Sequence, residues 1–139
     1  MKFSGRFMVA LVTALAATAL QAEGNLASKP EDLAPLNLTG DLKMSQTEYH
    51  LKTGQYYRIE ISSDGEEEFA WMSPELFRNI WVNQVVVNDL EVKAQSIYSL
   101  EFDAAGTFEV TFVPIRPGKY DFWVDGYANK GMAGAFYVD

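Results

Sequence analysis

The chain contains no cysteine among its 139 residues. It can therefore form no disulfide bond, offer no thiol nucleophile and supply no thiolate to a metal. Histidine, the most common ligand of transition metals in proteins, occurs only once, as His50. The serine, histidine and aspartate residues form no G-x-S-x-G signature. We therefore expect no catalytic residues and no enzymatic activity.

Basic residues are also scarce. The chain has 11 Lys and Arg against 19 Asp and Glu, which gives a formal net charge of −8. Nucleic acid is excluded as a partner on this basis, because binding phosphates requires the opposite charge. An acidic surface favours a basic protein as partner, and it also keeps an exported domain soluble.

The N-terminus has the layout of a secretory signal peptide. Lys2 and Arg6 precede a long uncharged run, and small residues follow this run. Cleavage is expected after Ala22, with residues 17–19 as the competing A-x-A site. The alternative is an uncleaved anchor, for which the apolar run is short. The sequence thus predicts a signal peptide over 1–22 and a periplasmic or secreted protein that is not attached to the membrane after cleavage.

Cleavage would leave a short leader and one domain. The removed residues include two basic and no acidic side chains, so nine basic residues would face 19 acidic ones, a net charge of −10. Residues 23–36 contain Pro30 and Pro35, which cannot donate to a strand ladder, and we expect a leader outside the regular fold. Residues 37–139 are long enough for a single domain.

Short runs of aromatic and β-branched residues, separated by turn residues, predict an all-β sandwich in this domain. The expected strands are 42–44, 49–51, 56–61, 69–72, 84–87, 90–93, 96–102, 107–114, 119–124 and 133–138. Asn88 and Asp89 predict a hairpin turn. Ser73 as N-cap and Pro74 at the first helical position predict one short helix over 73–80.

The C-terminal stretch resembles the end of a cupredoxin such as plastocyanin or pseudoazurin. It reads PGKYDFWV from Pro117, then DGY from Asp125 and GMAG from Gly131. In that family a PG-x-Y-x-F strand ends in a copper-ligating Cys, a ligating His follows in the loop, and a weak axial Met lies in a G-M-x-G turn. The resemblance spans Thr47 to Asp139 and implies a Greek-key β-sandwich.

The same resemblance implies that the copper ligands are missing. Without a gap, Val124 takes the position of the Cys and Tyr127 that of the His, and only Met132 is still a ligand type. The family's first copper His falls near Glu67. A type 1 copper site requires the thiolate, so we expect no cofactor, with copper as the alternative.

Three interpretations of this end of the domain remain open. In the first, Met132, Glu67 and His50 bind copper or iron, and the protein is a metal carrier with a non-blue site. Some exported cupredoxin-like proteins resemble this arrangement by using Glu, Met and His as copper ligands. Carboxylate and thioether are, however, an uneasy mixture of hard and soft ligands.

In the second interpretation, which we favour, Val124, Tyr127 and Met132 fill the vacated site with apolar bulk. This end then becomes a docking surface for a periplasmic protein, with Trp81 and Phe77 as further docking candidates. In the third, the glutamates at 66–68 are only a solvated turn, Met132 is core, and this end has no function. The favoured interpretation predicts an exported binding or accessory protein that acts through protein–protein contacts.

Overall fold

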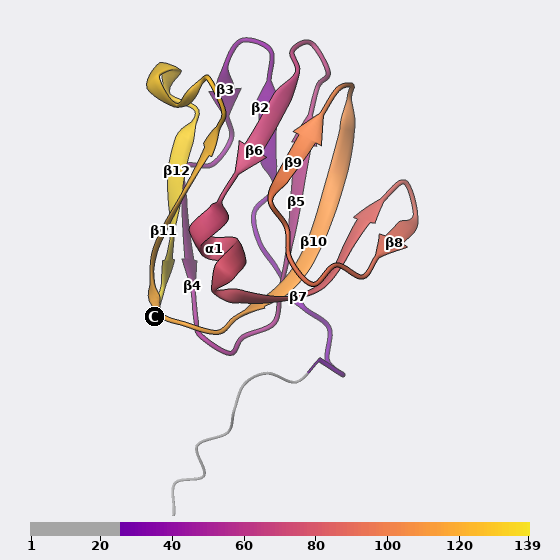
Figure 1. Cartoon of the computed structure of the whole chain (residues 1–139), viewed down its shortest axis with the longest axis vertical. Helices are drawn as coiled ribbons and strands as arrows, with labels where there is room; N and C mark the ends of the chain where they lie inside the picture. Colours follow the sequence, from indigo (N-terminus) through magenta and orange to yellow (C-terminus); the bar gives the residue numbers. More distant parts are fainter. Residues whose placement is uncertain (1–25) are drawn as a thin grey trace, which may run out of the picture.

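The structure is a computed structural model that describes residues 26–139, and it shows two β-sheets packed face to face (Figure 1). The predicted all-β sandwich with one short helix is confirmed. The predicted signal peptide, 1–22, lies outside the described residues. No helix formed by residues 26–139 has the length and apolarity that crossing a membrane requires.

The first sheet has the strand order β3-β2-β5-β10-β7-β8, and β1 pairs with β5 beside this path. Its strands are β1 (Glu31–Asp32), β2 (Leu36–Thr39), β3 (Lys43–Met44), β5 (Tyr57–Ser63), β7 (Ile80–Val87), β8 (Leu90–Val92) and β10 (Gly106–Pro114). The second sheet has the order β4-β12-β11-β6-β9. Its strands are β4 (Glu48–Leu51), β6 (Phe69–Met72), β9 (Ser99–Phe102), β11 (Gly118–Val124) and β12 (Ala133–Val138).

The core lies between the sheets because the strands alternate apolar and polar residues with a period of two. In β11, Tyr120, Phe122 and Val124 are buried while Lys119 and Asp121 between them are exposed. Strand β5 shows the same pattern, and in β12 the exposed Tyr137 lies between the buried Phe136 and Val138. Aromatic rings from both sheets fill the interior, as the alternation predicts.

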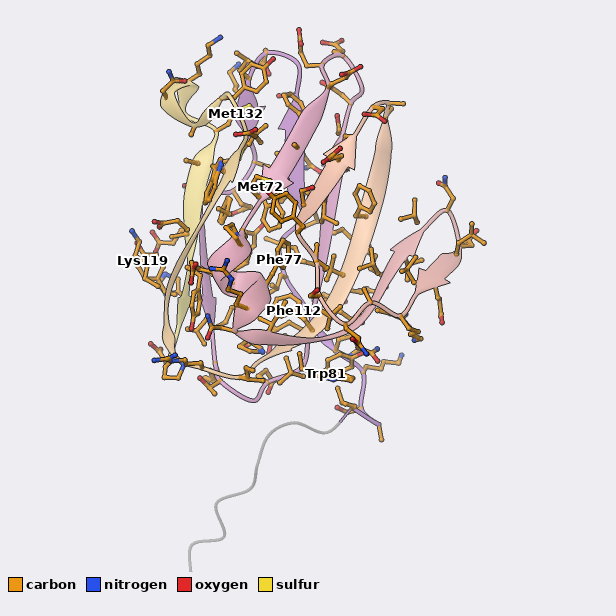
Figure 2. All side chains as sticks on the ribbon, viewed as in Figure 1. Met72, Phe77, Trp81, Phe112, Lys119 and Met132 are labelled. Carbon is orange, nitrogen blue, oxygen red and sulfur yellow. The ribbon has the colours of Figure 1, made fainter. Side chains whose placement is uncertain are left out.

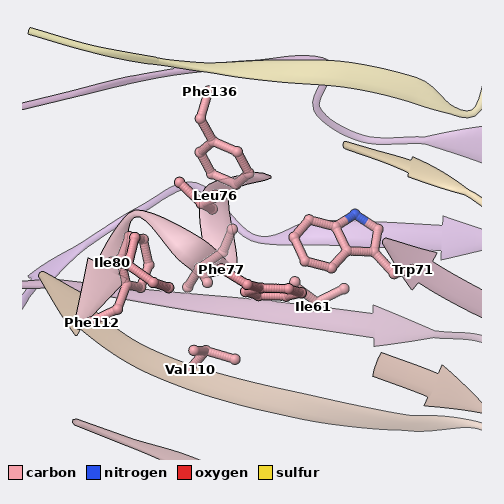
Figure 3. Close-up of a pocket in the computed structure, with 9 residues that line it drawn as sticks. Ile61, Trp71, Leu76, Phe77, Ile80, Val110, Phe112 and Phe136 are labelled. Atoms are coloured by element: carbon pink, nitrogen blue, oxygen red, sulfur yellow. The ribbon is translucent and has the colours of Figure 1, made fainter. Parts of the chain in front are cut away.

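Helix α1 (Pro74–Arg78) closes one side of the core. Figure 3 shows Leu76 and Phe77 pointing from the helix into the interior, where Leu76 lies beside Phe136 and Phe77 meets the ring of Trp71. Pro74 stands at the first position, as predicted. Ser73 occupies the N-cap position, but its side chain makes no capping bond; its buried hydroxyl donates to the carbonyl of Asp121 at 3.0 Å. The residue therefore ties the helix to β11.

The predicted leader is not wholly outside the fold. Glu31 and Asp32 pair with Tyr57 and Arg58 in a parallel bridge, and Leu36 begins β2 with a fully buried side chain. The two prolines do not prevent this, because β1 and β2 are short segments on either side of Pro35 and neither contains a proline. The sheet therefore begins before residue 37.

The hairpin of β7 and β8 projects from the sandwich on the side away from β11 and β12 (Figure 1). Its turn residues Asn88 and Asp89 have φ angles of 49° and 64°, the left-handed conformation that such a turn requires. This confirms the predicted hairpin. Strand β8 is one edge of the first sheet, and β3 is the other end of the strand order.

Candidate functional site

Two loops meet at one end of the sandwich, which we call the pole. One loop joins β5 to β6 and carries the glutamates 66–68. The other joins β11 to β12, residues 125–132, and contains the 3-10 helix η1 (Ala128–Lys130). Both lie at the upper end of the molecule in Figure 1. The approach of these two loops was predicted, and side chains from both line one surface depression.

Backbone hydrogen bonds hold the 125–132 loop in a fixed shape. The amide of Val124 donates to the carbonyl of Met132 at 2.9 Å, which joins the two ends of the loop. The carbonyl of Tyr127 accepts from Lys130 at 2.9 Å and from Met132 at 3.3 Å. Gly131 has a φ of 96°, which a residue with a side chain rarely adopts. The loop is therefore defined by its backbone.

The interior of the pole is apolar. Val124 and Met132 are both 0% exposed. Trp71, paired with Val124 across β6 and β11, is also buried. Met132 lies beneath the loop at the upper end of Figure 2. The interpretation that apolar bulk fills this position agrees with this packing. Met132 itself is core, however, and so cannot form part of a docking surface.

Tyr127 covers this interior from the outside. Its ring is partly exposed and meets the ring of Phe69 edge to face, with 5.7 Å between centroids. The Nζ of Lys130 lies 5.3 Å from the centre of the Tyr127 ring, a cation–π contact. Tyr127 is thus an aromatic side chain held in place from below and from one side.

Phe69 is a residue of the pole that the sequence interpretation missed. Counting without gaps placed the lost first ligand near Glu67, but Glu67 is exposed in the loop, whereas Phe69 is buried and contacts Tyr127. The signal was available in the alternation of β6, which points Phe69 and Trp71 to the same face. Phe69 is the side chain that fills the space next to Tyr127.

Carboxylates lie on one side of Tyr127. Two neighbouring depressions share Glu68 and Asp103, and neither includes a Lys or Arg in its lining. The acidic residues that line them are Glu66, Glu67, Glu68, Glu101, Asp103 and Asp125. We call this surface, with Tyr127 at its side, the acidic rim. Its charge attracts cationic groups and repels anionic ones.

The residues of the alternative metal site do not come together. His50 lies on β4 opposite Tyr137, stacks on the Tyr137 ring and contacts Glu48. Met132 immediately precedes the first residue of β12, five residues before Tyr137, so about 17 Å of extended chain separates it from the level of His50. Among residues 26–139, no group of three His, Asp or Glu side chains is placed to hold a metal ion.

The other two docking candidates do not lie on the same surface as Tyr127. Phe77 is on the side of helix α1 that faces the core, where it is buried between the sheets, so the prediction that it forms part of a docking surface is wrong. Trp81 is 45% exposed on β7. Figure 2 places Trp81 at the end of the molecule opposite Met132. Tyr127 and Trp81 therefore belong to different surfaces.

Neither a protein-family model nor a curated protein sequence matches this chain. Solved structures do. A multi-copper oxidase from Pediococcus acidilactici aligns with a TM-score of 0.62 and 11% identity over 97% of this chain and 31% of its own. Reduced auracyanin from Roseiflexus castenholzii aligns with a TM-score of 0.52 and 16% identity over 81% of this chain and 98% of its own.

The chain has the cupredoxin fold. A multicopper oxidase from Campylobacter jejuni, described as a metallo-oxidase, supports this with a TM-score of 0.58 and 8% identity over 82% of this chain and 31% of its own. The chain spans about a third of the length of these oxidases and nearly all of the auracyanin. At these identities the likeness concerns the fold.

The pole of this cupredoxin fold does not fit a type 1 copper ion. The chain has no cysteine, Val124 offers no donor atom, and the Tyr127 ring packs on Phe69. A type 1 site needs a thiolate and imidazoles around the ion. The side chains that face this interior are hydrocarbon, aromatic or thioether groups.

Proposed function

We propose that this chain is an exported binding or accessory protein with a cupredoxin fold that acts by contacting another protein. It needs no cofactor in this role and catalyses no reaction. Export is supported by the basic, apolar and small-residue order of residues 1–22. A role other than electron transfer is supported by the absence of a thiolate, without which the type 1 centre cannot form.

The acidic rim around Tyr127 is the observation that carries the proposal. Val124 and Met132 fill the interior of the pole. Another molecule can therefore contact the pole only through the side chains on its outer surface. That surface offers one braced aromatic ring beside carboxylates from three loops or strand ends. An aromatic anchor next to polar groups is the usual composition of a protein-binding hot spot.

The partner that fits this surface is basic. Lys or Arg side chains of a partner would meet the carboxylates of the rim, while an apolar group packs on Tyr127. Charges at a rim mainly accelerate association, and the buried anchor mainly determines the lifetime of the complex. Tyr127 and the glutamates should therefore affect different rate constants.

Affinity capture from the native periplasm tests the proposal. The bait is the tagged mature chain, compared with Tyr127→Ala and with the triple variant Glu66→Gln, Glu67→Gln, Glu68→Gln. We expect Tyr127→Ala to weaken binding by ~2 kcal/mol or more, mainly through faster dissociation. The triple variant should associate more slowly and show a flatter salt dependence.

A second triple variant provides the control, with Gln at the exposed glutamates 48, 60 and 75, which do not line the acidic rim. It changes the net charge equally and should bind as the wild type does. Metal analysis of the same samples checks for bound copper or iron. If both rim variants are folded and capture the same partner at unchanged rates, the proposed function is wrong.

A further inference from the structure

The edge strand β8 carries two apolar side chains that nothing in the described chain covers. Leu90 is 71% exposed and Val92 is 51% exposed. The register places Leu90 opposite Val87 and Val92 opposite Val85, so all four lie on the face of the hairpin that continues the core. Val85 is buried, whereas the face beyond it is open. An open apolar edge of this kind favours pairing with another strand.

The backbone of β8 has hydrogen-bonding groups directed at the free edge. The hairpin closes through two residues, so Val87 and Leu90 are its first hydrogen-bonded pair, and alternate residues follow. Val92 thus points its backbone groups at β7, and Glu91 points its groups outward. Lys93 follows β8 directly, and its ammonium contacts Gln84 of β7 and, at 3.5 Å, Glu91 of its own strand. If the alternation continues by one residue, the backbone groups of Lys93 also point outward.

The charged side chains on this edge complement those on the same edge of a second copy of the chain. In an antiparallel pair of two β8 strands related by a two-fold axis at Val92, Glu91 of each copy lies opposite Lys93 of the other. An axis at Glu91 would instead set the two Glu91 side chains against each other, and an axis at Leu90 would set Glu91 against Asp89. Like charges directly opposite each other destabilise a sheet. Only the Val92 axis avoids them.

We propose that β8 pairs with β8 of a second copy of this chain, antiparallel and centred on Val92. The outward N–H and C=O groups of Glu91 and Lys93 supply the new ladder bonds. The two Val92 side chains meet at the axis, where non-hydrogen-bonded pairs bring side chains close together. This surface is separate from the acidic rim and does not depend on the proposed function.

The dimer is expected to be weak. Its strands are three to four residues long, and stable interfaces bury roughly 1,600 Å² in total. We therefore expect a Kd on the order of 0.1 to 1 mM. At that strength the pairing matters where the protein is concentrated or held at a surface.

The test measures translational diffusion and amide shifts by NMR on the mature chain, from about 0.02 to about 2 mM, a range set by the expected affinity. The wild type should diffuse more slowly as concentration rises, with shifts confined to the edge around Glu91 to Ala94. Glu91→Lys and Lys93→Glu should each weaken association roughly tenfold, because each makes two like-charge contacts. The double variant Glu91→Lys, Lys93→Glu should associate as the wild type does.

The decisive measurement is made on a mixture of the two single variants. Glu91→Lys carries two lysines on this edge and Lys93→Glu carries two glutamates, so each pairs only weakly with itself but complements the other. An equimolar mixture should restore dimerisation even if both changes loosen the hairpin. A wild type that stays monomeric to 2 mM, single variants that associate normally, or a mixture that stays monomeric would each overturn the proposal.

Discussion

The backbone amide of Val124 and the backbone carbonyl of Met132 are joined by a hydrogen bond of 2.9 Å. The resemblance to cupredoxins implies that these two residues stand where that family has a copper-ligating Cys and Met. Their contact is made by main-chain atoms, so it does not depend on the side chains that would bind copper. The shape of the loop is therefore set by its backbone, and the interior that it encloses is apolar.

Restoring ligands on this frame should restore copper binding. We expect the triple variant Phe69→His, Val124→Cys, Tyr127→His, with Met132 retained, to bind Cu(II) and to show an intense visible charge-transfer band. Absorption spectroscopy and copper-dependent thermal stabilisation measure this outcome. The wild type with added Cu(II) should show no such band, because it has no thiolate.

The matched variant uses Glu67→His in place of Phe69→His. Since Glu67 is exposed and Phe69 contacts Tyr127, the Glu67 version should bind copper more weakly and without the intense band. Circular dichroism confirms that each variant is folded. The opposite order of the two would show that the ligand loop is assigned to the wrong residue.

Truncating Met132 should destabilise the domain. Its side chain is fully buried, so Met132→Ala removes buried atoms and leaves a cavity, which costs about 2–5 kcal/mol of unfolding free energy. Met132→Leu conserves the volume and should cost less than ~1.5 kcal/mol. Urea unfolding curves measure both changes. Equal stability of the Ala variant and the wild type would contradict the assignment of Met132 to the core.

Gly134 should not tolerate a side chain. A Cβ at this position would lie 2.3 Å from the carbonyl oxygen of Thr47 and 2.4 Å from a ring carbon of Phe122. Because the oxygen belongs to the backbone, Gly134→Ala must shift β12 away from the chain that leads into β4. We expect a loss of at least ~2 kcal/mol in urea unfolding.

Gly106→Ala serves as the comparison. No atom lies within 4 Å of a Cβ built at Gly106, which stands at the start of β10. The substitution should leave stability unchanged or raise it by up to ~1 kcal/mol, since it restricts the unfolded chain. A similar loss in both variants would mean that close packing is not what selects glycine at 134.

The buried hydroxyl of Tyr49 should make stability depend on pH in the alkaline range. Burial raises the pKa of Tyr49 above its ordinary value, and the hydroxyl donates to the carbonyl of Ala34 at 2.9 Å. The unfolded chain loses this proton at pH ~10, before the folded chain does. The contribution of Tyr49 is therefore complete below pH ~10 and declines above it, by up to ~1.4 kcal/mol per pH unit.

Urea unfolding of the wild type and Tyr49→Phe between about pH 8 and pH 11, which brackets the ordinary tyrosine pKa, checks this dependence. The variant should lose ~1 kcal/mol at pH 8 through the missing hydrogen bond. Above pH ~10 its decline should be shallower than that of the wild type. Parallel curves would exclude a buried, protonated Tyr49 as the cause.

Most of the fold could be predicted because its strands are marked locally. The alternation in β5 and β11, the Asn88-Asp89 turn and Pro74 at the helix start each act within a few residues, and each was confirmed. The role of Ser73 could not be predicted in this way. Its hydroxyl bonds to Asp121, 48 residues away, and only the packing of α1 on β11 brings the two together.

The pole was only partly predictable for the same reason. The approach of the 66–68 loop to the 125–132 loop followed from the resemblance, and the structure agrees. The prediction for Met132 and Phe77 depended on whether they are buried. Both are apolar residues that the sequence could place either at a surface or in the core. The alternation of β6 places Phe69 on the same face as Trp71, but the contact of Phe69 with Tyr127 joins residues far apart in the chain and appears only in the folded structure.

The position of β12 has a consequence for how the protein is made. This strand lies between β4, its parallel neighbour, and β11, and it contains the last residues of the second sheet to be synthesised. A nascent chain that ends at Gly131 possesses β4 and β11 but has nothing to join them. Parallel pairing across more than 80 residues also closes slowly, because a large loop entropy is lost before contacts form. Assembly of the second sheet must therefore wait until β12 has been synthesised, and until then β4 and β11 are not joined through it.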